Sequence, residues 1–83
     1  MAKSYDERRV GAFGAAVRLR REDLGLSQEG LGYKAHVHRT YVSDIERGAR
    51  NPTVKVIWKL AVALDTEPSA LFVLAEGVMA KGL

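Results

Sequence analysis

Residues 35–48, AHVHRTYVSDIERG, interleave bulky apolar side chains with short polar and basic ones. Val42 and Ile45 are three positions apart, so a helix would place both on one side. The opposite side would then carry a guanidinium, two hydroxyls and a carboxylate, from Arg39, Thr40, Ser43 and Asp44. Groups of these kinds bind phosphate oxygens or the edges of bases. The pattern therefore makes nucleic-acid recognition the first function to consider.

The segment around this stretch is basic. Between Lys34 and Lys59 there are six lysine and arginine residues against two acidic ones, within a chain of net charge +3. A basic stripe suits a polyanion, because each neutralised phosphate releases counterions. On charge alone, an ordinary solvated surface is the favoured explanation. Charge alone therefore only supports the nucleic-acid interpretation.

Other chemistries fit these residues poorly. His36 and His38 are two positions apart across an expected turn, with no third ligand nearby in the sequence, so we predict no metal site. Ser43, Asp44 and Glu46 lack the spacing of a nucleophile, its base and an orienting group, and no glycine loop for phosphates accompanies them. We expect neither an enzyme nor a bound cofactor.

The composition predicts one small globular domain. The chain has 83 residues, of which 47% are hydrophobic, and it contains no cysteine, which fits a reducing compartment. Its longest apolar stretch, SALFVLAEGVMA, contains Glu76 and is too short to cross a bilayer. The polar start, MAKSYDERR, lacks the apolar region of a signal peptide. We expect a cytoplasmic protein without a membrane partner.

Turn and capping residues divide the chain into five short helices, with no strand pattern. The expected helices cover about residues 9–24, 28–35, 38–47 and 53–64, and a fifth starts at Pro68. The core-facing positions expected on the first and fourth helices are Val10, Phe13, Val17 and Leu24, and Val54, Ile57, Leu60, Ala61 and Leu64. This predicts an all-α domain of residues 9–74 between an N-terminal tail, 1–8, and a C-terminal tail, 75–83.

Two short helices joined by a tight turn in a basic all-helical domain indicate a helix-turn-helix. The stretch LGLSQEGLGYKAHVHRTYVSDIERGARNPT, followed by WKLAVALDTEPSALF, resembles the Cro/C1 (XRE-type) family of bacterial and phage repressors. Within it, HRTY and IERGARNPT are similar to controller proteins of restriction-modification systems. The resemblance covers about residues 13–72. It implies a compact, lambda-repressor-like fold of five helices, with the third in the DNA major groove.

The resemblance also assigns roles to side chains. Arg39 is the foremost candidate for base reading, because a guanidinium can bond guanine O6 and N7 together. Gln28 and the loop after the third helix are expected to bind phosphates. Arg21 and Glu46 are expected to form a structural salt bridge. The predicted DNA-binding set is Gln28, His38, Arg39, Thr40, Tyr41, Ser43, Asp44, Arg47, Arg50 and Asn51.

Some of these roles have an alternative. Tyr41 suits either a DNA contact or half-buried packing with its hydroxyl at the rim. Helix capping and loop solvation are the alternatives for Arg47, Arg50 and Asn51.

Three departures from the family pattern bear on the fold. His36 stands in the turn where the family usually has glycine, so we expect a left-handed residue with slight strain. Arg20 falls where many relatives have leucine, and Leu24 is expected to supply the missing apolar contact. Trp58 and Val62 occupy positions on the fourth helix that are commonly charged in the family.

Apolar residues off the core face predict a two-fold dimer through Trp58, Val62, Leu71 and Phe72, together with the C-terminal tail. The alternative for Trp58 is that it lies flat on its own helix. We therefore predict a homodimeric transcriptional regulator that binds double-stranded DNA at a near-palindromic operator, with RNA polymerase as a further candidate partner. The alternative function is an antitoxin-like module that mainly binds a partner protein. The polar and basic face of the third helix favours DNA.

Overall fold

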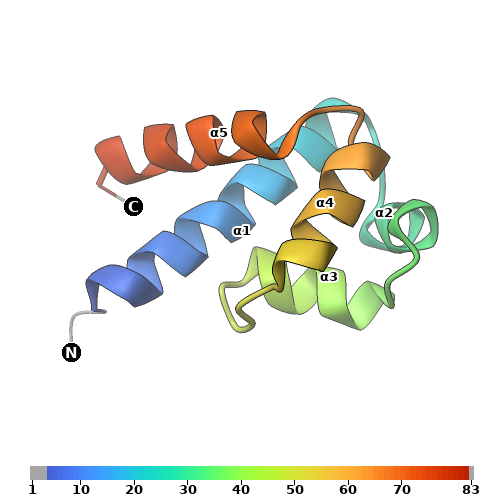
Figure 1. The fold of residues 1–83 in the computed structure, drawn as a ribbon, viewed down its shortest axis with the longest axis horizontal. Helices are drawn as coiled ribbons and strands as arrows, with labels where there is room; N and C mark the ends of the chain where they lie inside the picture. Colours follow the sequence, from blue (N-terminus) through green and yellow to red (C-terminus); the bar gives the residue numbers. More distant parts are fainter. Residues whose placement is uncertain (1–3, 83) are drawn as a thin grey trace.

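The computed structural model describes residues 4–82, which form five α-helices in the predicted order and no strand. The helices are α1 (Tyr5–Asp23), α2 (Gln28–Ala35), α3 (Arg39–Glu46), α4 (Val54–Ala63) and α5 (Pro68–Ala80). The long helices α1 and α5 lie side by side, α3 packs against α1, and α2 lies between α3 and α4, which in turn contacts α5 (Figure 1). The all-α, five-helix prediction is confirmed.

The first helix begins four residues earlier than predicted. The Ser4 hydroxyl accepts a hydrogen bond from the backbone N–H of Glu7, at 3.1 Å, and the Glu7 carboxylate accepts one from the backbone N–H of Ser4, at 3.2 Å. This reciprocal capping box, which involves no apolar side chain, starts the helix. Residues 5–8, expected in the N-terminal tail, are therefore helical. The expected tails also include residues 1–3 and 83, which lie outside the described residues.

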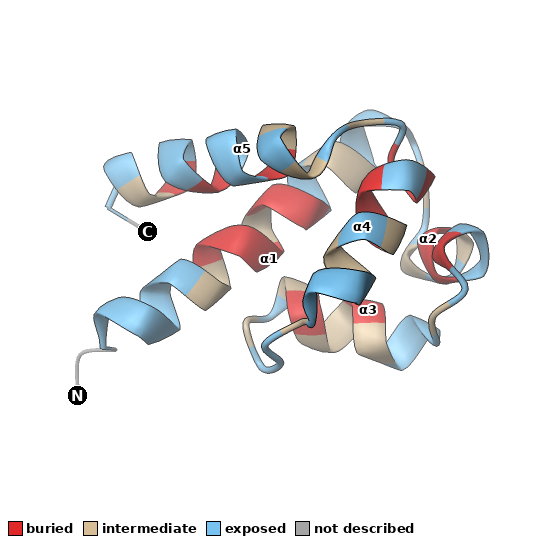
Figure 2. Cartoon of the chain, in the orientation of Figure 1, coloured by how far each residue is buried: buried red, intermediate tan, exposed pale blue. Residues whose placement is uncertain are grey.

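The last helix continues well beyond the predicted domain boundary. Pro68 occupies its first turn, where a missing backbone N–H costs nothing, and the helix runs to Ala80. Leu71, Ala75 and Val78 share one face and are buried. Most of the expected C-terminal tail is thus helical, and one side of it is buried, as the red stretches of α5 facing α1 in Figure 2 show.

One core is built where the five helices meet, and its largest fully buried side chains are Val17, Leu31, Val42, Ile45, Leu60, Leu64 and Leu71. Three expected core residues lie outside it, and the first is Val10, which is only partly buried. Val54 is 71% exposed, because it is the first residue of α4 and precedes the turns that contact the core. Leu24 is exposed as the C-cap of α1, so it does not replace an apolar contact at position 20.

Arg20 attaches α1 to α4 by hydrogen bonds. Its Nε donates to the carbonyl oxygen of Leu64 at 3.0 Å, and its Nη2 donates to that of Asp65 at 3.2 Å. The last carbonyls of a helix have no partner within the helix, so a guanidinium placed there satisfies them. Hydrogen bonds from Arg20 thus replace the apolar contact that was expected to be missing at this position.

The turn between α2 and α3 has the expected left-handed residue. His36 has φ 58° and ψ 40°, in a region that costs most side chains free energy but that histidine tolerates better than β-branched residues do. Gly32 allows the turn to lie directly on α2, since a Cβ at this position would come within 2.7 Å of the Val37 carbonyl oxygen. The angle between the two helices is therefore set by backbone contact.

Candidate nucleic-acid interface

The inner side of α3 is anchored by apolar packing and close backbone contact. Val42 and Ile45 are fully buried, as the pattern of the sequence predicted. A Cβ on Gly14 of α1 would overlap the carbonyl oxygen of Ile45. The backbones of α1 and α3 therefore touch, and no larger residue fits between them at this separation.

The predicted salt bridge between α1 and α3 is confirmed. The guanidinium of Arg21 donates from Nε to Glu46 Oε2 at 2.7 Å and from Nη2 to Oε1 at 3.0 Å, and its Nη1 donates to the Leu26 carbonyl at 2.8 Å. The two charged side chains are only 11% and 3% exposed. The hydrogen bond to Glu46 raises the pKa of Arg21 further above its usual range. Since the folded pKa is the higher one, this stabilisation is complete at neutral pH and is lost only in strong alkali.

Gln28 joins the same network at the start of α2. Ser27 caps this helix by accepting a hydrogen bond from the backbone N–H of Gly30 at 2.9 Å, as predicted. The side-chain Nε2 of Gln28 donates to Glu46 Oε1 at 3.0 Å. The side chain of Gln28, which we expected to bind a phosphate, is thus held in place by the salt bridge between Arg21 and Glu46.

The outer side of α3 borders a shallow polar hollow of about 290 Å³. The structure gathers six of the ten predicted DNA-binding residues around it: Gln28, Arg39, Thr40, Ser43, Asp44 and Arg47. We call this hollow the α3 groove. Asp44 is the one acidic residue in that lining. Arg39 is exposed and has no hydrogen-bond or ion-pair partner among the described residues, which leaves its guanidinium available to a ligand.

The other four predicted DNA-binding residues lie outside the α3 groove. His38 is the N-cap of α3, where its Nδ1 accepts a hydrogen bond from the Thr40 backbone N–H at 3.0 Å. Tyr41 is half-buried, and the Arg50 guanidinium carbon lies 4.6 Å from its ring centroid. Asn51 is exposed and borders a separate hollow on the side of α1 and α5.

The loop after α3 folds back over the end of that helix. Gly48 adopts a left-handed conformation, with φ 72°, and the backbone N–H of Ala49 donates to the Asp44 carbonyl at 2.8 Å. This return brings two arginines to one carboxylate. Asp44 Oδ1 lies 2.5 Å from Arg47 Nη2, and Oδ2 lies 3.8 Å from Arg50 Nη2. Sequence reasoning named these three residues without this pairing.

The four predicted dimer residues do not form one patch. Trp58 is 56% and Val62 75% exposed, and both border a hollow beside the turn of the helix-turn-helix. Phe72, half-exposed, packs against Phe13 with ring centroids 5.2 Å apart. Leu71 is fully buried, so its inclusion in the interface was wrong. The helical spacing that places Ala75 and Val78 inward also places Leu71 in the core.

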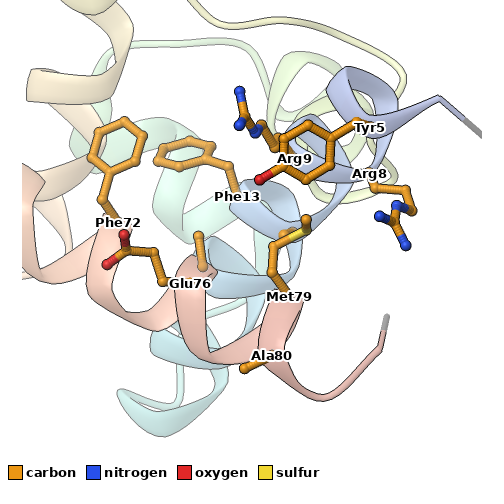
Figure 3. A pocket seen from close by; sticks show the side chains of 10 residues that line it. Tyr5, Arg8, Arg9, Phe13, Phe72, Glu76, Met79 and Ala80 are labelled. Atoms are coloured by element: carbon orange, nitrogen blue, oxygen red, sulfur yellow. The ribbon is translucent and has the colours of Figure 1, made fainter.

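A larger hollow, of about 670 Å³, lies between the first turns of α1 and the face of α5. Phe13 and Phe72 stand at one end, and Tyr5 and Met79 toward the other (Figure 3). The guanidinium carbon of Arg9 lies 3.8 Å from the Tyr5 ring centroid. Sequence reasoning missed this hollow because it assigned residues 5–8 and 75–80 to tails.

Two further findings concern functions considered from the sequence. Within residues 4–82, no helix combines the length and the apolar character that a membrane crossing requires. The same residues contain no group of three or more side chains suited to a metal ion.

Comparison with known proteins gives consistent matches. A family model described as Helix-turn-helix matches residues 17–71. Control protein C.BamHI of Bacillus amyloliquefaciens is 45% identical over 60 residues, which are 71% of this chain and 74% of that protein. The chain matches several other curated regulators over only 40% to 60% of their length.

Solved structures resemble the chain in the same way. The restriction-modification controller protein C.AhdI of Aeromonas hydrophila has a TM-score of 0.74 and 45% sequence identity, covering 75% of this chain and 94% of that one. The wild-type restriction-modification controller protein C.Esp1396I has a TM-score of 0.82 at 28% identity, covering 95% of this chain and 99% of that one.

Proposed function

Because this chain belongs to the helix-turn-helix family of Cro/C1-type DNA-binding regulators, we propose that it is a homodimer that binds a near-palindromic operator and controls a restriction-modification system. The observation that carries the proposal is the α3 groove, where six predicted DNA-binding side chains gather on a helix whose other side is buried. The family consists of regulators, so we also propose that the chain catalyses no reaction and acts in the cytoplasm. A contact with RNA polymerase rests on the resemblance alone.

The contents of the α3 groove suit a base-reading role. A recognition helix needs one apolar side for its scaffold and one polar side for base edges. Arg39 stands at the first residue of α3, exposed and without a partner among the described residues, as a helix that enters the major groove by its N-terminal end requires. Gln28 lies at the first turn of α2, where unpaired backbone N–H groups favour a phosphate.

Support for the homodimer comes from apolar surface. Trp58 and Val62 are four residues apart on α4, and both are largely exposed. A domain of this size buries little apolar surface by itself, and association through such residues adds to it. Two-fold symmetry would place the two copies of α3 about 34 Å apart, one turn of DNA.

Selection from random duplexes, followed by footprinting, tests the function directly. We expect a near-palindrome with half-sites one helical turn apart, bound with an affinity that falls steeply as salt rises. A scrambled duplex of the same composition is the control. Equal and salt-insensitive affinity for the two duplexes would contradict the proposal and would favour the antitoxin-like alternative.

Two arginines should respond differently to truncation. Arg39→Ala is expected to lose about 1 to 3 kcal/mol of operator binding and to relax the preference at one base pair, because a bidentate contact to guanine disappears. Arg50→Ala should weaken all duplexes alike, because a phosphate contact carries no sequence information. Affinities for the operator and its single-base variants measure both effects. An unchanged preference profile in Arg39→Ala would exclude Arg39 as the base reader.

A further inference from the structure

The α3 groove contains a feature that simple attraction to DNA does not explain. Its outward face includes a carboxylate, Asp44, in a position that a phosphate-rich ligand would approach. The side chain is 21% exposed, and it occupies the middle of a charge cluster formed with Arg47 and Arg50. A carboxylate here repels phosphates and also neutralises part of the positive charge that attracts them.

The geometry of the cluster follows from the end of α3. Gly48 and the hydrogen bond from Ala49 to the Asp44 carbonyl turn the chain back on itself. Arg47 therefore contacts one carboxylate oxygen and Arg50 approaches the other. Both arginines remain more than half exposed, at 64% and 52%, so DNA can reach them without unfolding the loop.

The two arginines and the carboxylate have different partners available on DNA. The arginines can exchange the carboxylate for phosphate oxygens on any sequence. The carboxylate can gain a partner only from an amino group on a base edge, such as cytosine N4, and therefore only on some sequences. Binding to an arbitrary duplex leaves the carboxylate beside phosphates without a donor, whereas a matching operator supplies one.

We propose that Asp44 is a specificity-determining residue that pairs with Arg47 and Arg50 in the free protein and thereby suppresses binding to DNA of arbitrary sequence. The inference rests on the proposed function, since it requires that the α3 groove meets DNA. Discrimination then arises from a penalty against wrong sequences as well as from attraction to the right one. Asp44 acts on arbitrary DNA through the two arginines, and on the operator through a base.

The test compares Asp44→Asn with the wild type on the selected operator and on a scrambled duplex, at several salt concentrations. Asparagine keeps the shape of the side chain and removes its charge. We expect affinity for the scrambled duplex to rise about tenfold, with a salt slope steeper by roughly one, because the arginines no longer give up an ion pair to bind phosphates and a negative charge beside the phosphates is gone. Operator affinity should rise less or fall, so the ratio of the two affinities decreases.

Two further variants establish whether the effect of Asp44→Asn arises from the two arginines. Glu22→Gln removes a carboxylate that pairs with Arg18 at 3.2 Å on α1, outside the α3 groove, and measures the effect of net charge alone. Its effect on the scrambled duplex should be much smaller than that of Asp44→Asn. In an Arg47→Ala, Arg50→Ala background, Asp44→Asn should lose most of its effect, because the released side chains are absent.

Three results would overturn the inference. Scrambled-duplex affinity that is unchanged in Asp44→Asn, or raised no more than in Glu22→Gln, would show that the ion pairs do not restrain the arginines. Loss of operator affinity alone would make Asp44 an ordinary base reader and would leave the proposed function intact. A wild-type protein that binds no duplex in a salt-dependent way would remove the proposed function and this inference together.

Discussion

Replacing Arg21 with methionine is expected to lower the free energy of unfolding by about 3 to 5 kcal/mol. The substitution leaves the Glu46 carboxylate, 3% exposed, with Gln28 Nε2 as its remaining hydrogen-bond donor, and it removes the donor to the Leu26 carbonyl. An uncompensated buried charge is among the costliest single changes in a small protein. Domains of this size have a total stability of about 5 to 10 kcal/mol, so a third or more of that stability would be lost.

Denaturant unfolding followed by circular dichroism measures the effect, and two comparisons identify its cause. Arg18→Met removes an arginine from an exposed pair on the same helix and should cost less than about 0.5 kcal/mol. The double variant Arg21→Met, Glu46→Leu should recover much of the loss, because apolar side chains of similar volume can replace a buried pair. If Arg21→Met cost no more than Arg18→Met, the pair would not anchor α3.

Trp58→Ala is expected to convert the proposed dimer to a monomer at micromolar concentration. A large aromatic at the centre of a self-complementary patch contributes about 2 kcal/mol or more to association. In a two-fold interface the substitution removes one indole from each protomer. The combined loss is therefore about 4 kcal/mol, which corresponds to a dissociation constant raised roughly a thousandfold.

Sedimentation velocity of the wild type and of Trp58→Ala over a range of concentrations measures the dissociation constant of each protein. The helical content of both proteins is measured alongside to confirm that they are folded. Tyr33→Ala is the matched control, because Tyr33 is an aromatic residue on α2 that is 85% exposed and lies outside the proposed interface. It should leave the dimer unchanged. A wild-type monomer, or a dimer that tolerates Trp58→Ala, would refute an interface built on α4.

Local patterns predicted most of the fold. The apolar spacing on α3 predicted correctly that Val42 and Ile45 are buried, because residues three positions apart lie on the same side of a helix. The start of α1 was missed, since its capping box between Ser4 and Glu7 involves no apolar residue. The end of α5 was missed because Ala75 becomes a core residue only through contact with a helix distant in the sequence.

In the candidate site, too, the sequence predicted features that depend on neighbouring residues and missed contacts that depend on the fold. The sequence predicted which residues face outward on α3, because helical periodicity decides that. It did not predict that Arg47 and Arg50 share one carboxylate, which depends on the direction of the chain after Gly48. The role of Arg20 was equally hidden, since its acceptors at Leu64 and Asp65 are more than forty positions away.

The residues that anchor α3 and the residues that face outward are different side chains. Val42 and Ile45 hold the helix on its scaffold, whereas Arg39 and Thr40 are exposed and make no side-chain contact that the core requires. Changes at the exposed positions should therefore cost little stability, within about 0.5 kcal/mol each. Under the proposed function, substitutions at these positions can therefore change operator preference while the fold stays intact. The same separation makes the exposed positions of α3 the natural targets of a directed-evolution library for new operators.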